Sequence, residues 1–283
     1  MPRASLKPRR PTVRDRGESS SAWLTGFHPV REALLAGRRR LDRLWIRPGN
    51  QGAERSELVE LARSAGVAVE VVDAADLKKR AESDGNDQGV ALRVGPLPEL
   101  SLAELLDYAE TAPGAGSRLV VLDGVEDPQN VGALARVAES AGAHGLILTE
   151  RRAPALTPAV SRASAGAIEW LRVARVSNLG RALSTLQKKG YWIVAAAPAS
   201  SNATLYELDD RILTGNLAVV LGAEGKGIRR SILEQADHLV EIPMRGRIAS
   251  LNVSTAGAII LYDLLRRSES RAARSDESSG GVG

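Results

Sequence analysis

The sequence predicts an α/β protein with two domains, of which the larger, C-terminal one is built on a parallel sheet. The chain has 283 residues, which is enough for two ordinary domains. From residue 118 onwards, short segments that are apolar throughout alternate with segments of helical periodicity. Strands of this kind are typical of a parallel sheet that helices cover on both faces. A shorter alternation of helical and extended patterns earlier in the chain predicts a small α/β domain.

Composition divides the chain into five segments. We expect a basic, disordered tail over residues 1–21 and the small α/β domain over residues 22–96. Residues 97–117 carry proline and glycine at both ends of a short helical stretch, which predicts a linker with one capping helix. The parallel-sheet domain should span residues 118–267. Residues 268–283 end in SSGGVG and are expected to be a second disordered tail.

The residue types that are scarce exclude several kinds of site. The chain has no cysteine, which excludes disulfides, thiolate metal sites and a cysteine nucleophile. Its three histidines, His28, His144 and His238, are far apart in the sequence, so we expect no metal. No apolar run approaches the roughly 18 residues of a membrane-spanning helix, and the first 20 residues lack the apolar core of a secretory signal. A cytoplasmic protein without a membrane partner is therefore expected.

The positive charge is concentrated at the N-terminus. The formal net charge is +4, and residues 1–20 carry six Lys or Arg against two Asp or Glu, so the rest of the chain is neutral. An RNA-binding surface on the folded part must then be a local patch. The candidates are five arginines within ten residues: Arg38, Arg39, Arg40, Arg43 and Arg47. An ordinary solvated face is the alternative interpretation.

Ligands of open parallel sheets bind beyond the carboxyl ends of the strands. In this chain, those ends are followed by the loops after Val125, Ala197, Gly222 and Pro243. Three segments with unusual residues begin at or near these loops. The candidate site is therefore expected there.

The first of these segments is DGVEDPQNVGALARVAESAG. Asp127 can cap a helix whose first residue is Pro128, and Gly132 leaves one face of that helix bare for a close approach. Asn130 and Arg136 lie within two turns of each other, and we expect both to reach the strand end from the same side. A well-capped surface helix would explain Asp127 and Pro128 but not the other three residues.

The second and third segments are VVLGAEGKGI and EIPMRGRIASLNVSTAGAIILYDLL. The glycines of the second resemble a phosphate loop, but no Ser or Thr follows Lys226, and the order GxxGxG is not the dinucleotide fingerprint. A flexible turn is the alternative. In the third, Ser250 is a candidate helix cap and Asn252 falls in the first turn, where NH groups remain free. Gly257 inside the helix indicates that a neighbour packs against its backbone.

Together, the three segments resemble the SpoU, or TrmH-like, branch of the SPOUT methyltransferases. They match the patterns DxxxDPxNxGxxxR, LGxExxG and IPMxGxxxSLNVSxA over about 150 residues. The segments GFHPVREAL and QGV in the small domain resemble the RNA-binding domain that precedes the catalytic domain in ribosomal RNA guanosine-2'-O-methyltransferases. The family usually has histidine before QGV, where this chain has Asp87, so a role that rests on that imidazole cannot be transferred.

The resemblance implies a deep trefoil knot, a homodimer and S-adenosylmethionine bound in a bent form. It implies a polar active-site set of Asn130, Arg136, Glu224, Ser250 and Asn252. It implies cofactor contacts from the backbone around Ala197, Gly222, Ile242, Met244 and Leu251. Arg136 could accept the ribose proton or bind the neighbouring phosphate; a guanidinium with a pKa above about 12 is a poor base.

Function is then expected to be 2'-O-methylation of RNA, with a guanosine of large-subunit ribosomal RNA as the acceptor. Two alternatives stay open at this point. One is a transfer RNA 2'-O-methyltransferase of the same branch. The other is a catalytically silent RNA-binding protein that assists ribosome assembly, which the survival of every motif position argues against.

Overall fold

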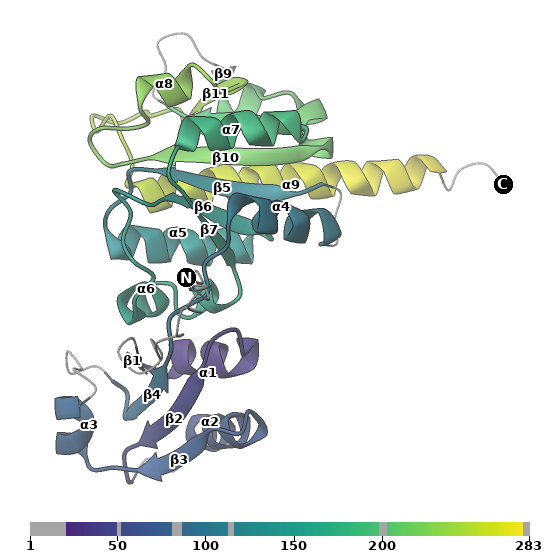
Figure 1. Cartoon of the computed structure of the whole chain (residues 1–283). Helices are drawn as coiled ribbons and strands as arrows, with labels where there is room; N and C mark the ends of the chain where they lie inside the picture. Colours follow the sequence, from purple (N-terminus) through teal and green to yellow (C-terminus); the bar gives the residue numbers. More distant parts are fainter. Residues whose placement is uncertain (1–20, 50–51, 81–86, 113–115, 198–202, 280–283) are drawn as a thin grey trace, which may run out of the picture.

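The computed structural model describes residues 21–49, 52–80, 87–112, 116–197 and 203–279. Within these ranges the chain forms two bodies, each with its own hydrophobic core (Figure 1). The basic tail expected at residues 1–20 lies outside the described residues. Of the helices in these ranges, none combines the length and the apolar composition that a membrane crossing requires.

The N-terminal body is a four-stranded mixed sheet with helices on both faces. In sheet order its strands are β1 (Ala22–Thr25), β4 (Val90–Val94), β2 (Leu41–Ile46) and β3 (Ala68–Val71). Only β2 and β3 are parallel. One face packs on α1 (Phe27–Ala36) and α2 (Ala53–Ser64), and the other contacts α3 (Ala74–Arg80) through Leu77. The expected small α/β domain is present.

The C-terminal body is a seven-stranded sheet in which every pair is parallel, as the sequence predicts. In sheet order the strands are β7 (Arg172–Val176), β6 (Gly145–Thr149), β5 (Arg118–Asp123), β10 (Asn216–Gly222), β8 (Tyr191–Ala196), β11 (His238–Glu241) and β9 (Ala203–Thr204). Its long strands are buried because helices cover both faces.

Two separate cores lie on the two sides of this sheet. One contains residues of α4 (Leu102–Thr111), α7 (Leu179–Lys188) and α8 (Arg230–Leu233). The other contains residues of α5 (Pro128–Ser140), α6 (Pro158–Ala163) and α9 (Val253–Ser279). Short 3₁₀ turns complete the body: η1 (Ala167–Glu169), η2 (Leu205–Glu207) and η3 (Asp210–Thr214).

Helix α5 lies between α6 and α9, and two glycines allow this packing. A Cβ atom on Gly132 would lie 2.4 Å from the Cβ of Ala163 on α6, and one on Gly257 of α9 would lie 2.5 Å from Leu134 on α5. A side chain at Gly132 would collide with the backbone of α6 and force the helices apart, and one at Gly257 would displace the side chains of Leu134 and Leu221. The bare helix face predicted at Gly132 therefore receives another helix, not a ligand, and the neighbour predicted for Gly257 is α5. Asp127 caps α5 as predicted, accepting from the backbone NH of Gln129.

Two boundaries predicted from the sequence are corrected by the structure. The segment expected to be a linker belongs to the C-terminal body, because Leu97 and Leu105 are buried in its two cores. The chain after Ser268 is not a disordered tail but continues α9 as far as Ser279. Residues 268–279 contain no glycine or proline that would interrupt the helix.

Candidate active site

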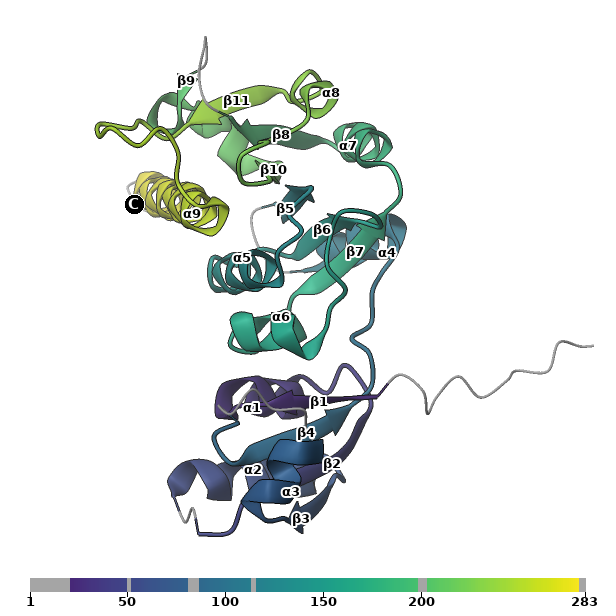
Figure 2. The ribbon, with the colours of Figure 1, turned by 90° about the vertical axis from the view of Figure 1, so that its left-hand side faces the viewer.

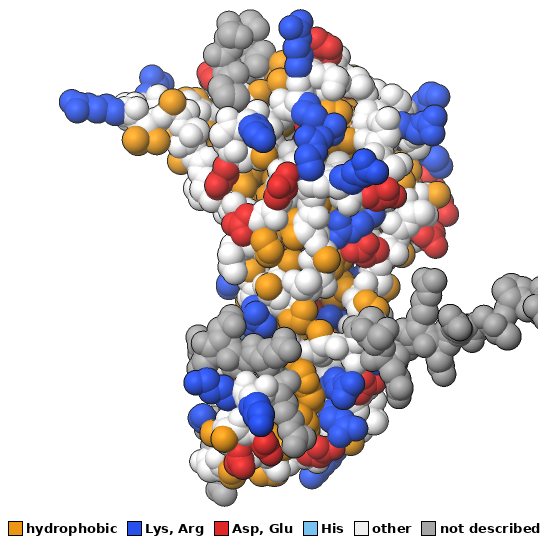
Figure 3. Space-filling view, turned by 60° about the vertical axis from the view of Figure 1, so that its left-hand side comes forward, with side chains coloured by type: hydrophobic (Ala, Val, Ile, Leu, Met, Phe, Trp, Pro, Cys, Tyr) orange, Lys and Arg blue, Asp and Glu red, His pale blue; other side chains and the backbone are white. Residues whose placement is uncertain are grey.

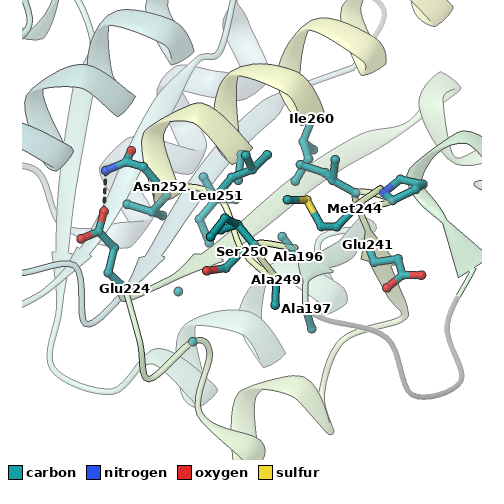
Figure 4. Close-up of a pocket in the computed structure, with 18 of the residues that line it drawn as sticks. Ala196, Ala197, Glu224, Glu241, Met244, Ala249, Ser250, Leu251, Asn252 and Ile260 are labelled. Carbon is teal, nitrogen blue, oxygen red and sulfur yellow. Dashed lines mark hydrogen bonds between the residues drawn. The ribbon is translucent and has the colours of Figure 1, made fainter. Parts of the chain in front are cut away.

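A cavity of about 1090 Å³ opens at the carboxyl ends of β8, β10 and β11 (Figure 4). Its wall is formed by three segments, residues 196–197, 221–227 and 240–253. Small side chains make up much of this wall, together with apolar residues such as Ile260. Its volume is just above the range of roughly 300 to 1,000 Å³ that is typical of sites for small organic ligands, so it has room for such a ligand.

The loop after β10 folds tightly back on the strand end. A Cβ atom on Gly222 would lie 2.3 Å from the carbonyl carbon of Gly227, and the NH of Gly227 donates to the oxygen of Ala223 at 2.8 Å. Only glycine fits at position 222 because the opposing atoms are backbone atoms that cannot move aside. The conformation leaves the backbone of the strand end open to the cavity.

A buried carboxylate that the sequence reasoning missed anchors this loop. Asp123 ends β5, and its side chain, only 1% exposed, accepts from the backbone NH of Arg229 at 2.9 Å and from the Arg229 Nε at 2.8 Å. A buried carboxylate needs such partners to offset its lost hydration. The signal that could have found it is a lone acid at the end of the apolar run RLVVLD.

Three of the five predicted active-site side chains meet at the edge of the cavity. The Nδ2 of Asn252 donates to the Oδ1 of Asn130 at 2.9 Å. It also donates to the Oε1 of Glu224 (Figure 4). The Oδ1 of Asn252 accepts from the backbone NH of Ser254 at 2.8 Å, so Asn252 caps α9. The prediction that Ser250 is the cap is wrong, because the helix begins two residues later than expected.

The other two predicted side chains do not join this cluster. Ser250 is exposed on the cavity wall. Arg136 is exposed on α5, does not line the cavity, and makes no hydrogen bond or ion pair with any residue that the structure describes. Six residues advance a helix by about 600°, which places Arg136 roughly 120° around α5 from Asn130. The expectation that both reach the strand end from one side is therefore wrong for this conformation.

All five residues expected near the cofactor line the cavity. Ala197 and Gly222 follow or end their strands, and Ile242, Met244 and Leu251 belong to the third segment of the wall. Contact with a cofactor stays a prediction for each of them. Among the residues that the structure describes, no three His, Cys, Asp or Glu side chains are grouped as a metal site would require.

The five clustered arginines do not form a common surface. Arg39 is buried against the other body, where its Nη2 lies 2.6 Å from the Oε1 of Glu169, so its predicted contact with RNA is wrong. Arg38 donates to the backbone oxygens of Glu169 and Leu171. Arg40 and Arg43 are about half exposed and paired with acids, and only Arg47 is exposed without an ion pair among the described residues.

The two N-terminal motifs are in contact. The Oε1 of Gln88 accepts from the backbone NH of Phe27, the first residue of α1, at 2.6 Å. Gln88 has a φ of 52°, which turns its side chain back onto the helix. Asp87 accepts from the NH of Gly89 and so shapes this turn. Over the face in Figure 3, basic and acidic side chains are interspersed on both bodies.

Comparison with protein families gives two matches that cover most of the chain. Residues 117–262 match the model described as "SpoU rRNA Methylase family". Residues 23–100 match the model described as "RNA 2'-O ribose methyltransferase substrate binding". The first match includes the cavity and the polar cluster, and the second covers the N-terminal body.

Individual proteins are similar over nearly the same length. A 23S rRNA (guanosine-2'-O-)-methyltransferase, RlmB, of Shewanella oneidensis is 38% identical over 87% of this chain and 97% of its own. YacO of Bacillus subtilis, named as a TrmH family tRNA/rRNA methyltransferase, is 35% identical over 87% of this chain and 95% of its own.

Solved structures share the fold over most of the chain. An RNA 2'-O ribose methyltransferase superposes with a TM-score of 0.70 at 29% identity, over 89% of this chain and 90% of its own. An AdoMet-bound rRNA methyltransferase from Sinorhizobium meliloti shares the fold, with a TM-score of 0.69 at 24% identity over 89% of each chain.

Proposed function

The chain belongs to the SpoU rRNA methylase family, and we propose that it transfers a methyl group from S-adenosylmethionine to a ribose 2'-hydroxyl of RNA. The observation that carries this proposal is the polar cluster of Asn130, Glu224 and Asn252 at the edge of a cavity of suitable size. It places hydrogen-bonding groups beside a pocket that small and apolar residues line in large part. Such a site can orient an acceptor hydroxyl against a bound donor.

The cavity fits the cofactor chemically. S-adenosylmethionine supplies an activated methyl group on a sulfonium, and the protein must hold it and align the acceptor. Backbone groups at Ala197, Gly222 and Leu251 can bind the polar edges of an adenosine, while Ile242 and Met244 offer apolar contact. We propose that the chain forms a deep trefoil knot here and binds the cofactor bent.

Proton removal from the ribose needs an acceptor, and Arg136 is the residue in question. Its exposure favours binding of the phosphate beside the target ribose, because a solvated guanidinium keeps its charge and is a poor base. The carboxylate of Glu224 accepts a hydrogen bond from Asn252 and lines the cavity, whereas Arg136 does not line it, so Glu224 is the second candidate acceptor.

We propose a guanosine of large-subunit ribosomal RNA as the acceptor. The RlmB relatives and the matched substrate-binding region support this choice. The name of the Bacillus relative includes transfer RNA, and transfer RNA is the second candidate. A ribosomal RNA substrate would place the enzyme in the cytoplasm.

We also propose a homodimer. One support is membership of the family. The other is that large apolar side chains are exposed: Ile248, beside the cavity, is 72% exposed, and Tyr262, on α9, is 48% exposed. Sedimentation of the purified protein at several concentrations tests this state.

The function is tested with purified protein, labelled S-adenosylmethionine, and separate preparations of ribosomal and transfer RNA. We expect label in the 23S fraction, resistant to alkaline cleavage at one guanosine. Mapping 2'-O-methyl sites in cells with and without the protein then identifies the nucleotide. Cofactor binding without methyl transfer to any RNA would instead support the silent, ribosome-assembly alternative.

A further inference from the structure

The two bodies of the chain meet at a buried charged cluster, here called the junction: Arg38, Arg39, Ser161 and Glu169. The Oε1 of Glu169 accepts from the Nη2 of Arg39 at 2.6 Å and from the Oγ of Ser161 at 2.8 Å. Arg38 donates to the backbone oxygens of Glu169 at 3.0 Å and Leu171 at 2.7 Å. The arginines come from the N-terminal body and their partners from the catalytic one.

Burial makes the junction dependent on docking of the two bodies. The side chains of Arg39 and Glu169 are 2% and 1% exposed. Burial raises the pKa of Glu169, against the opposing effects of the Arg39 and Arg38 charges and of the Ser161 hydrogen bond. A carboxylate in this position needs its arginine, because a buried charge without a partner is strongly unfavourable.

A second contact between the two bodies lies beside the junction. Gly166 has a φ of 90°, and a Cβ atom there would lie 2.6 Å from the Cβ of Glu32 on α1. The Nε1 of Trp170 donates to the Oε2 of Glu32 at 2.7 Å. Helix α1 therefore lies directly against the segment after α6, as Figure 2 shows. Two separated contacts fix an orientation as well as a distance.

The junction is connected to the candidate active site through one helix. Ser161 belongs to α6, and α6 packs against α5 at Gly132, two residues after Asn130. Helix α5 also contacts η1, which contains Glu169. The elements that hold the N-terminal body are thus the direct neighbours of the helix that carries Asn130 and Arg136.

We propose that Glu169 is a positioning residue that fixes the N-terminal body relative to the methyl-transfer cavity, so that RNA held by that body presents its target ribose there. This inference rests on the proposed function. On this proposal, Arg38 and Arg39 help to align the RNA by holding the two bodies together, and they do not contact the RNA themselves. RNA that does not reach the N-terminal body should not depend on the junction.

The first test compares Glu169→Gln with Glu110→Gln in the full chain. Glu110 is a matched control, because its carboxylate pairs with Lys189 at 3.0 Å on the surface of the same body. For 23S RNA at saturation, we expect the single-turnover rate of Glu169→Gln to fall about tenfold or more, since small misplacements cost large factors. For an oligonucleotide with only the target and its nearest neighbours, the rates of wild type and variant should agree. Affinity for S-adenosylmethionine should be unchanged.

Two outcomes of this test would overturn the proposal. One is an unchanged rate on 23S RNA. The other is an equal loss on long and short RNA, or a loss of cofactor binding, either of which would assign Glu169 to the fold of the catalytic body alone.

The second test measures the geometry itself and needs no activity. Because the chain has no cysteine, Val71→Cys and Glu234→Cys provide unique labelling sites on the two bodies, both exposed. With unlabelled protein in excess, fluorescence transfer between the labels should give a narrow distance distribution that broadens in Glu169→Gln. An unchanged distribution would contradict the proposal. If the wild-type chain methylates no RNA, the proposed function fails, and this measurement still decides the docking.

A double variant separates docking from charge. Apolar residues of similar size can replace a buried ion pair, so Arg39→Met with Glu169→Leu should restore the narrow distribution and the rate on 23S RNA together. Restored docking without a restored rate would overturn the proposal.

Discussion

The cavity edge and the junction use the same residue types in opposite ways. At the cavity edge, the side chains of Glu224 and Asn252 are exposed. Arg136, on α5 outside the cavity, is also exposed and makes no ion pair with the described residues. At the junction, the charges of Arg39 and Glu169 are almost fully buried and paired with each other. The difference indicates that a charged group is available to a ligand only where the fold leaves it solvated.

The largest effect is expected for Arg136→Ala. If Arg136 contacts the RNA at the reacting ribose, this change should lower the single-turnover rate by about 100-fold or more. The fold and the affinity for S-adenosylmethionine should remain, because Arg136 does not line the cavity and makes no hydrogen bond or ion pair with another described residue. The rate must be measured with saturating RNA, so that weaker binding does not imitate a catalytic loss. Wild-type rates under these conditions would remove Arg136 from the site.

Arg136→Lys refines this prediction. Lysine keeps the positive charge but loses the planar fork of the guanidinium. A nearly active lysine variant would favour simple charge placement at a phosphate. An inactive one would favour the fork geometry or a proton role for the guanidinium.

Binding of S-adenosylmethionine should depend strongly on Gly222, which ends β10 at the cavity wall. In Gly222→Val, the side chain would collide with the backbone of Gly227, so the loop must open and the wall is lost. We expect calorimetry to detect no binding of S-adenosylmethionine. Gly215→Ala is the matched control, because no atom lies within 4 Å of its Cβ position. Cofactor binding by the valine variant would show that the cavity is not the cofactor site.

Two arginines of the same sequence cluster, Arg39 at the junction and Arg47 on the surface, should differ in how much they contribute to the free energy of unfolding. Arg39→Met leaves Glu169 buried without its partner, a loss of about 3 kcal/mol for a buried pair. Arg47→Met, on an exposed residue, should change stability by less than about 0.5 kcal/mol. Thermal unfolding measures both. Affinity for RNA should fall more in Arg47→Met than in Arg39→Met. Equal melting temperatures of the two variants would contradict the predicted difference in stability.

A smaller effect is expected from deletion of residues 1–20. This segment carries the whole net positive charge, and phosphate contacts release counterions, so the deletion should flatten the salt dependence of RNA binding. Cofactor affinity should stay the same. An unaltered salt slope would show that the segment makes no contact with RNA.

The smallest effect is expected from metal removal. Methyl transfer from a sulfonium to a hydroxyl requires alignment and a proton acceptor, for which the polar cluster and Arg136 are the candidates. Activity in EDTA should therefore equal activity without it. A loss that added metal restores would count against the proposed chemistry.

By itself, the sequence determined the parallel sheet, the cap at Asp127 and two of the segments that line the cavity, those that begin near Gly222 and Ile242. These features depend on local patterns: apolar strands, capping residues and glycines, each of which acts within a few residues. The same patterns could not show that Asn130, Glu224 and Asn252 bond to one another, because they lie up to 122 residues apart.

Only the tertiary structure decided which charges are available. Arg39 and Arg47 look alike in sequence, yet one is buried against Glu169, 130 residues away, and the other is exposed. Residues 97–112, expected to link two domains, are part of the catalytic body because their leucines fill its cores. The reason is general: burial depends on which distant surfaces meet, and that is a property of the packed chain and not of any local segment.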